Sequence, residues 1–236
     1  MGNNLAEQAY DHIRARLFRG DWSPGTRLAN RALADALGIS FTPVREALQR
    51  LASENLVDFR PGAGAFVRAP DRRELAELYD LRLVIEPYAA RLAARHAVDF
   101  ELDALDACNA GFGRIRDALA ARDGDGPAAA TAEGAELDAW LDIEERFHRT
   151  VLEAARNRWL SKVGADLSFV SRVFHPQRGA RGLVTAAIAD ETWRSHSELT
   201  ACLRARREAD AADWMARQIE RGRDTVLAYF DRRPNP

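Results

Sequence analysis

The stretch from Asn30 to Leu51, NRALADALGISFTPVREALQRL, constrains the fold of this chain more than any other segment. Apolar residues recur at helical spacing on both sides of Gly38, and the spacing restarts within a few residues of that glycine. The apolar stripes are Leu33, Ala34 and Leu37 before the glycine, and Val44, Ala47, Leu48 and Leu51 after it. Two short amphipathic helices joined by a glycine-containing turn are typical of a helix-turn-helix.

The second helix of this pair carries polar side chains on its outward face. Ser40 or Thr42 is the candidate cap, and Pro43 is tolerated because it falls in the first turn. The outward side chains that can donate to phosphates and base edges are Thr42, Arg45, Gln49 and Arg50. The pattern predicts a DNA-binding helix, although similar helix pairs also occur in helical proteins that never touch DNA.

Two short runs rich in valine and phenylalanine follow the helix pair. They span residues 56–60 and 65–68 and flank the turn Pro61-Gly62-Ala63-Gly64. Such runs around a Pro/Gly turn predict a β-hairpin, and the glycines allow a close approach to a nucleic-acid backbone. A helix-turn-helix followed by a hairpin is a winged helix.

These motifs together resemble the N-terminal domain of GntR-type bacterial transcription regulators. The matching pieces are PGTRL at 24–28, TPVREALQRL at 42–51, Leu56-Val57 and PGAGAFV at 61–67. The resemblance implies that Arg31, Arg45 and Gly62 stand at positions that meet the operator DNA. Phe41 stands where the family usually has arginine, so a usual operator contact is missing.

Arginine suits such positions because its guanidinium pairs bidentately with the two major-groove acceptors of guanine. We expect Arg45 to contact a base. Arg31 and Arg50 can equally hold phosphates, and Arg50 can also be a solvated charge without a DNA contact. Thr42 can cap its helix, bind a phosphate, or do both.

Composition and charge indicate an intracellular protein. The N-terminus lacks a signal-peptide pattern, and no apolar run reaches the roughly 18–20 residues of a membrane helix. Cys108 and Cys202 have no CxxC spacing, which argues against a zinc finger and suits a reducing cytosol. Residues 1–68 contain nine arginines against seven acids. Because this excess is small and DNA affinity depends on phosphate neutralisation, a homodimer is expected. We therefore expect a cytoplasmic, nucleoid-associated bacterial protein with no membrane partner.

The rest of the chain predicts helices only. The expected helices cover 71–98, with a kink at Pro87, then 99–122, 135–155, 159–174, 184–206 and 208–231. Loops are expected at 123–133 and 177–182, where glycine, proline and small residues gather. The expected protein is therefore mainly α, with a winged-helix domain at 1–68, a linker at 69–73 and an all-α bundle of about six helices at 74–236.

Four polar residues of the bundle form a candidate site. Glu144 and His148 lie one helical turn apart on one face, and His196 and Gln218 come from later helices. Helical bundles build metal sites from such inward side chains. A single histidine on a helix, however, is more often packed or solvated.

Residues 74–230 resemble the effector domain of the FadR-type branch of the same family. The matching pieces are LYDLRLVIEPYAARLAA at 78–94, the ExxFH run at 144–148, Asn157, and the stretch 195–218. In that branch an aspartate and three histidines hold a divalent metal that coordinates a small organic acid. The resemblance places Glu144, His148, His196 and Gln218 at these four positions, so glutamate replaces aspartate and glutamine replaces the last histidine.

The two replacements leave the cofactor open. An amide oxygen is a weaker ligand than imidazole for zinc, nickel or iron, so the expected set is Glu144, His148 and His196, and the site can equally hold no metal. Arg82, His148, His196 and Gln218 are then expected to bind a small carboxylate effector. The alternative for Arg82 is an ion pair with Glu86, one turn on.

Three functions remain open from the residues. The expected one is a transcription regulator, most simply a repressor, that binds operator DNA and responds to a small organic acid. The second is a metal-dependent enzyme with a DNA-binding tether, but the chain lacks a nucleophile elbow, a phosphate loop and HExxH. The third is a DNA-binding protein without an effector, which does not explain a helical half of this size. We therefore expect no enzyme.

Overall fold

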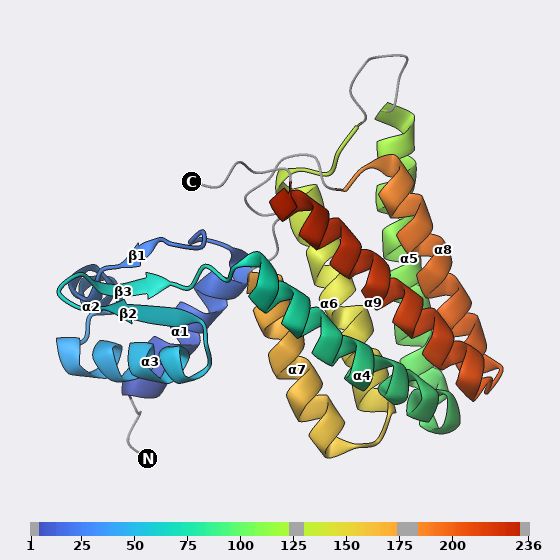
Figure 1. Ribbon diagram of the computed structural model, residues 1–236, viewed down its shortest axis with the longest axis horizontal. Helices are drawn as coiled ribbons and strands as arrows, with labels where there is room; N and C mark the ends of the chain where they lie inside the picture. The colour runs from blue at the N-terminus through green and yellow to red at the C-terminus, as the bar shows by residue number, and fades with distance from the viewer. Residues whose placement is uncertain (1–4, 123–129, 174–183, 232–236) are drawn as a thin grey trace. The chain divides into compact units, whose positions relative to one another are not determined.

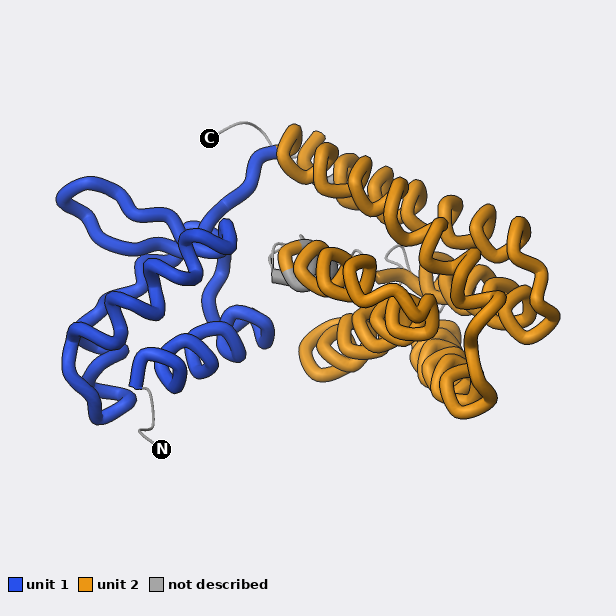
Figure 2. The backbone as a smooth tube through the Cα atoms, turned by 90° about the horizontal axis from the view of Figure 1, so that it is seen from below, with its two compact units in different colours: residues 1–71, 172–174 blue, residues 72–171, 175–236 orange. Residues whose placement is uncertain are grey.

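The computed structural model describes residues 5–122, 130–173 and 184–231, and the expected loop 177–182 and most of the loop 123–133 lie outside this part. Two compact units divide the chain (Figure 2). The first comprises residues 1–71 and 172–174, and the second comprises residues 72–171 and 175–236. Figure 1 shows that the strands belong to the first unit, whereas the second is built from helices.

The first unit contains three helices and a small antiparallel sheet. Its elements are α1 (Leu5–Arg19), β1 (Arg27–Leu28), α2 (Asn30–Leu37), α3 (Phe41–Ser53), β2 (Val57–Arg60) and β3 (Gly64–Val67). The strand order is β1-β3-β2, so the hairpin of β2 and β3 gains a third strand that pairs Arg27 with Phe66. The winged helix-turn-helix is confirmed, while α1 and β1 were not predicted.

Local chemistry explains the turn between α2 and α3. Gly38 ends α2 with a φ of 65°, a left-handed conformation that suits glycine, and its N–H reaches the carbonyl oxygens of Ala34 and Asp35. Ser40 is the extended residue before α3, but its side chain makes no capping bond. Thr42 lies inside the first turn of the helix, so Ser40 occupies the cap position. Pro43 also lies in that turn, where its missing N–H costs nothing.

The core of the first unit is apolar. Helices α1 and α3 pack together, and Ile13, Leu17, Leu48 and Leu51 are completely buried. The α3 residues Val44, Ala47, Leu48 and Leu51 recur at helical spacing, so one side of the helix faces this core. The opposite side of α3 is left at the surface.

The second unit contains six helices among the described residues. They are α4 (Arg72–His96), α5 (Asp99–Arg122), α6 (Gly134–Ala154), α7 (Arg158–Val173), α8 (Ala186–Arg204) and α9 (Glu208–Asp231). Helix α4 begins within the segment 69–73 that was expected to be a linker, and it continues through Pro87 as one helix. Thr131 and Thr185 form an isolated β-bridge, although no extended pairing was expected after the wing.

Ion pairs at both ends mark the register of α4 against α9, the two helices with the most extensive packing among the described residues of this unit. Arg72 binds Asp231 at 2.7 Å, and Arg95 binds Glu208 at 2.7 Å. The two helices are therefore antiparallel.

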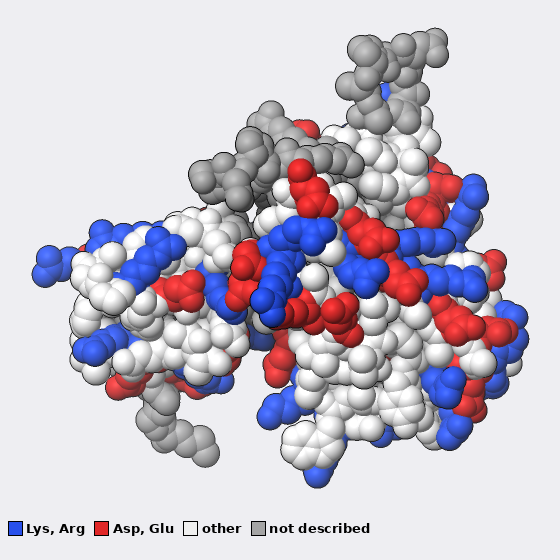
Figure 3. Space-filling model, in the orientation of Figure 1, with Lys and Arg blue, Asp and Glu red and all other residues white. Residues whose placement is uncertain are grey.

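Basic and acidic side chains alternate over the visible surface of this unit (Figure 3). No helix among the described residues is long and apolar enough to cross a membrane.

Candidate functional sites

The outward side of α3 presents the residues expected to meet DNA. Phe41, Thr42, Arg45 and Gln49 are all exposed, and Arg31 is exposed on α2. Arg31 and Arg45 form no ion pair with any described residue. Their guanidinium groups are therefore available for phosphates or base edges.

Arg50 is different, because its guanidinium is held within the first unit. It lies 2.8 Å from a carboxylate oxygen of Glu7 and 3.5 Å from one of Glu54, and it stacks over the ring of Tyr10 at 3.6 Å. Tyr10 in turn donates its hydroxyl to Glu54 at 2.9 Å. These contacts join α1 to α3, so Arg50 has a structural role that the sequence alone did not reveal.

The wing turn depends on glycine at its tip. Gly62 has a φ of 72°, and Ala63 closes the turn by donating its N–H to the Arg60 carbonyl at 3.0 Å. A Cβ atom on Gly62 would meet nothing within 4 Å, so the backbone at this tip is open to an approaching molecule.

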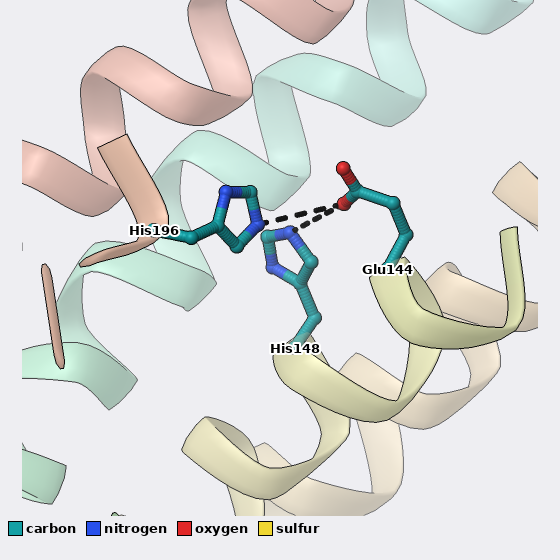
Figure 4. Close-up of side chains that lie close together, drawn as sticks. All are labelled: Glu144, His148 and His196. Carbon is teal, nitrogen blue, oxygen red and sulfur yellow. Dashed lines mark ion pairs between the residues drawn. The ribbon is translucent and has the colours of Figure 1, made fainter. Parts of the chain in front are cut away.

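In the second unit the structure brings Glu144, His148 and His196 together (Figure 4). Glu144 and His148 come from α6 and His196 from α8. One carboxylate oxygen of Glu144 lies 3.4 Å from Nε2 of His148 and 3.6 Å from Nε2 of His196. Both imidazoles are buried, whereas the Glu144 side chain is 28% exposed and forms the open side of the cluster.

The Nδ1 atoms of His148 and His196 both carry a hydrogen. Nδ1 of His196 lies 2.8 Å from the Thr192 carbonyl oxygen, which can only accept, so this nitrogen carries a hydrogen. Nδ1 of His148 lies 2.6 Å from Glu86 and likewise carries a hydrogen. In a neutral ring each Nε2 then presents its lone pair toward Glu144, which is how metal-binding histidines are oriented.

A buried charge chain, Arg82–Glu86–His148, connects α4 to α6. Arg82 donates from Nε to Glu86 at 2.5 Å, and the other Glu86 oxygen faces His148. Burial opposes the charge of Glu86, but Arg82 and His148 overcome it and lower the pKa of this carboxyl to about 2. Burial likewise opposes the charge of His148, but Glu86 and Glu144 raise the pKa of this imidazole to about 9. Despite its own desolvation, Glu144 has a lowered pKa because His196 and His148 lie beside it.

The sequence left open whether Arg82 pairs with Glu86 or binds the effector. The ion pair with Glu86 is present, and the side chain is buried. The contact between Glu86 and His148 was not foreseen. The two residues are 62 positions apart, and nothing in the local pattern around either of them indicates the other.

Gln218 carries a buried polar side chain without hydrogen bonds. It is buried at 8% exposure, and neither its oxygen nor its nitrogen has a hydrogen-bond partner among the described residues. In the register marked by the ion pairs of α4 and α9, Gln218 is level with Ile85, between Arg82 and Glu86 along α4. Nε2 of His196 is likewise buried without a hydrogen bond. Such unsatisfied buried groups are costly and suit a missing partner.

The cluster fits a small divalent metal ion. Histidine nitrogens and carboxylate oxygens bind such ions at about 2.0–2.2 Å, so neighbouring ligand atoms stand roughly 3.0–3.4 Å apart in tetrahedral or octahedral geometry. The Glu144 oxygen lies 3.4 and 3.6 Å from the two Nε2 atoms, and all three ligand atoms lie within 4.8 Å of one another, so a bound ion would draw them closer together. Glu144, His148 and His196 could supply three ligands to such an ion, which would leave coordination positions for another molecule.

Two family models match the chain and together cover both units. The model described as bacterial regulatory proteins, gntR family, matches residues 5–67, and the FCD domain model matches residues 77–221. The chain belongs to the GntR family, in the branch with an FCD domain. This GntR-family member is accordingly a DNA-binding transcription regulator.

Named relatives agree with this assignment. The Nta operon transcriptional regulator of Aminobacter aminovorans is 30% identical over 213 residues, which cover 86% of each chain. The transcriptional repressor GlaR of Escherichia coli K12 is 24% identical over 89% of this chain and 90% of its own. The solved structure of E. coli McbR/YncC has a TM-score of 0.76 and 22% identity, covering 97% of this chain and 99% of that one, and it shows the shared fold.

Proposed function

We propose that this GntR-family regulator is a repressor whose operator affinity is set by a small organic acid bound inside the second unit. The observation that carries the proposal is the pair of unsatisfied buried groups, Nε2 of His196 and the side-chain amide of Gln218. A protein that only held two DNA-binding units together would fill this place with apolar side chains, since buried polar groups without partners destabilise a fold.

The groups around the cluster suit a carboxylate. A divalent metal held by Glu144, His148 and His196 would supply the positive charge that attracts the acid. The Gln218 amide can donate one hydrogen bond to the ligand and accept another. Arg82 contributes positive potential from behind, while its pairing with Glu86 keeps it from serving as a direct salt-bridge partner. The exposed part of Glu144 marks the side from which the acid enters.

The DNA contacts divide by role. Arg45 contacts a base edge from the recognition helix α3, and Thr42, Gln49 and Arg31 bind phosphates or neighbouring bases. Gly62 brings the wing backbone to the DNA. Arg50 contributes mainly by holding α3 against α1, because Glu7 and Glu54 already neutralise its charge.

The regulator acts as a homodimer through the exposed face of α4. Leu81, Val84 and Tyr88 are 44%, 71% and 51% exposed and share one side of this helix. A second copy fits this face, because the acidic Glu77 precedes the apolar residues and the basic Arg91 follows them. Antiparallel packing of two α4 helices about Val84 sets Glu77 of each copy opposite Arg91 of its partner, which is the self-complementarity a two-fold interface requires.

Control by the acid follows from a population shift. Two dimer arrangements that differ in how they place the DNA-binding units have different affinities for the operator, and the acid favours one of them. A switch between mostly bound and mostly free operator requires a preference of about 5 kcal/mol for one arrangement. No step of this scheme needs bond making or breaking, so a regulator rather than an enzyme is the simplest interpretation.

A binding titration tests the proposal. The purified chain is mixed with fluorescent DNA from its own upstream region, with and without a panel of small carboxylates, in buffer containing zinc or a chelator. At least one acid should release the DNA from the wild type and fail to do so from His196→Ala. His96→Ala is the matched control, because His96 is an exposed histidine of α4 and should change nothing. If no acid changes DNA affinity, or if His96→Ala and His196→Ala behave alike, the effector proposal is wrong.

A further inference from the structure

The first unit exposes a large aromatic side chain on the helix that faces DNA. Phe41 is the first residue of α3 and is 51% exposed. Its ring has no aromatic or cationic partner among the described residues. The apolar residues that follow it in α3, from Val44 to Leu51, are buried in the core. Phe41 therefore adds little to the core and leaves apolar surface in water.

The position of this ring places it among the DNA-contacting side chains. Phe41 and Arg45 are four residues apart, so they are neighbours on adjacent turns of the helix surface. Gln49 continues the same exposed edge one turn further. A recognition helix meets base edges in the major groove mainly through its N-terminal residues. Phe41 stands in that N-terminal turn.

The major groove offers one apolar group on the edges of the four bases, which is the C5-methyl group of thymine. We propose that Phe41 contacts the C5-methyl group of a thymine in the operator and thereby sets base preference at that position. Arginine, the residue that the family resemblance implies at position 41, would favour guanine at the same place. The replacement thus changes the preferred base instead of only removing a contact.

Phe41 and Arg45 would then divide the specificity of α3. The guanidinium of Arg45 selects acceptors on a guanine, while the ring of Phe41 selects a methyl group on a neighbouring base pair. The contribution of Phe41 depends on burying apolar surface and not on charge. It should therefore change little with salt concentration, unlike contacts to phosphates.

Replacing thymine with deoxyuridine tests the contact, because it removes the methyl group and keeps base pairing. The full-length wild type, Phe41→Ala and Phe41→Arg are each used to select bound sequences from a random DNA library. Fluorescence anisotropy then measures binding to the selected operator with each thymine replaced in turn by deoxyuridine. At one thymine position the wild type should lose about fourfold in affinity, equivalent to about 0.8 kcal/mol for one buried methyl group.

Three comparisons decide the result. Phe41→Ala should bind the methylated and unmethylated operators equally, Phe41→Arg should select guanine at that position, and Arg45→Ala should keep the sensitivity to deoxyuridine. Equal losses in the wild type and Phe41→Ala, or no loss in the wild type, would overturn the assignment of Phe41 while leaving operator binding intact. The inference rests on sequence-specific DNA binding, so a wild type that selects no sequence at all overturns both.

Discussion

The two units of this regulator place their polar groups in opposite ways. The first unit has an apolar core and carries Arg31, Arg45 and Gln49 at its surface. In the second unit polar and charged side chains are buried. All the buried polar and charged residues of the described chain belong to this unit, and they are Arg82, Glu86, Asn109, His148, Ser195, His196, Thr200 and Gln218.

This difference fits the proposed function, in which the first unit binds DNA and the second unit binds a small acid. DNA is large and highly charged, so the first unit needs only a stable scaffold with exposed donors. A small ligand offers few contacts, so its site must exclude water and surround it. The second unit accordingly contains buried groups that bind one another, such as Arg82, Glu86 and His148. It also contains buried groups without a hydrogen-bond partner among the described residues, such as the Gln218 amide. Its stability should depend on the buried charge chain, on pH and on ligands, whereas that of the first unit should not.

The largest expected effect comes from breaking the buried charge chain. Replacing Glu86 with alanine leaves the buried Arg82 and His148 without the carboxylate they share. Removing one partner of a buried ion pair costs about 3–5 kcal/mol. Urea unfolding of the second unit, followed by near-UV circular dichroism, should show a loss of this size.

The matched control for that experiment is Asp103→Ala. Asp103 of α5 lies 3.5 Å from Arg204, but both side chains are exposed, so solvent screens the pair. The control should unfold almost as the wild type does. A similar loss in both variants would mean that the removal of any carboxylate of this unit, and not the break in the buried charge chain, is being measured.

Metal affinity should respond next most strongly. His196→Ala removes one of three candidate ligands and should weaken zinc binding by more than about 100-fold, since loss of an outer hydrogen-bond partner alone costs about 10- to 100-fold. Gln218→His should tighten binding, because imidazole is a better ligand than an amide oxygen. Competition with a fluorescent zinc chelator measures both. Unchanged affinity in both variants would show that the metal, if bound, lies elsewhere.

The metal-free second unit should lose stability as the pH rises toward 9. The pKa of His148 is raised from its ordinary value of 6.5 to about 9 in the folded chain. Its charged form therefore stabilises the fold fully below pH 6.5, and this contribution is lost as the pH rises through about 9. The shift corresponds to at most about 3 kcal/mol. Urea midpoints measured with chelator between pH 6.5 and 9.5 should fall, and His148→Gln should remove the slope.

The same contrast between the units explains what the sequence could predict. Helical spacing around Gly38 predicted the helix-turn-helix, and a Pro/Gly turn between β-rich runs predicted the hairpin, because both are local patterns. The two-residue strand β1 is too short to carry a pattern, so the third strand of the sheet was missed. Glu144, His148 and His196 were predicted together from the family resemblance, and the structure brings them together.

Long-range contacts were beyond sequence reasoning. Glu86 was expected only as a partner of Arg82, because the two are one helical turn apart, and its contact with His148 depends on how α4 packs on α6. The contact of Arg50 with Glu7 likewise depends on the packing of α1 on α3, which is set by burial of the residues between them. In both cases the local spacing is regular, but the partner is chosen by tertiary packing.

The smallest expected effects separate two exposed arginines of α3, Arg45 and Arg50. Arg45→Ala should cost about 1–3 kcal/mol of operator affinity and relax base preference at one position, because a bidentate contact to one base pair is lost. Arg50→Ala should reduce operator affinity less and in equal proportion for all sequences, because Glu7, Glu54 and Tyr10 already engage its guanidinium. Both variants are measured by anisotropy against the selected operator and single-base variants of it. If Arg45→Ala weakens binding to all sequences equally, Arg45 contacts a phosphate. If Arg50→Ala changes base preference, the network with α1 opens when the protein binds DNA.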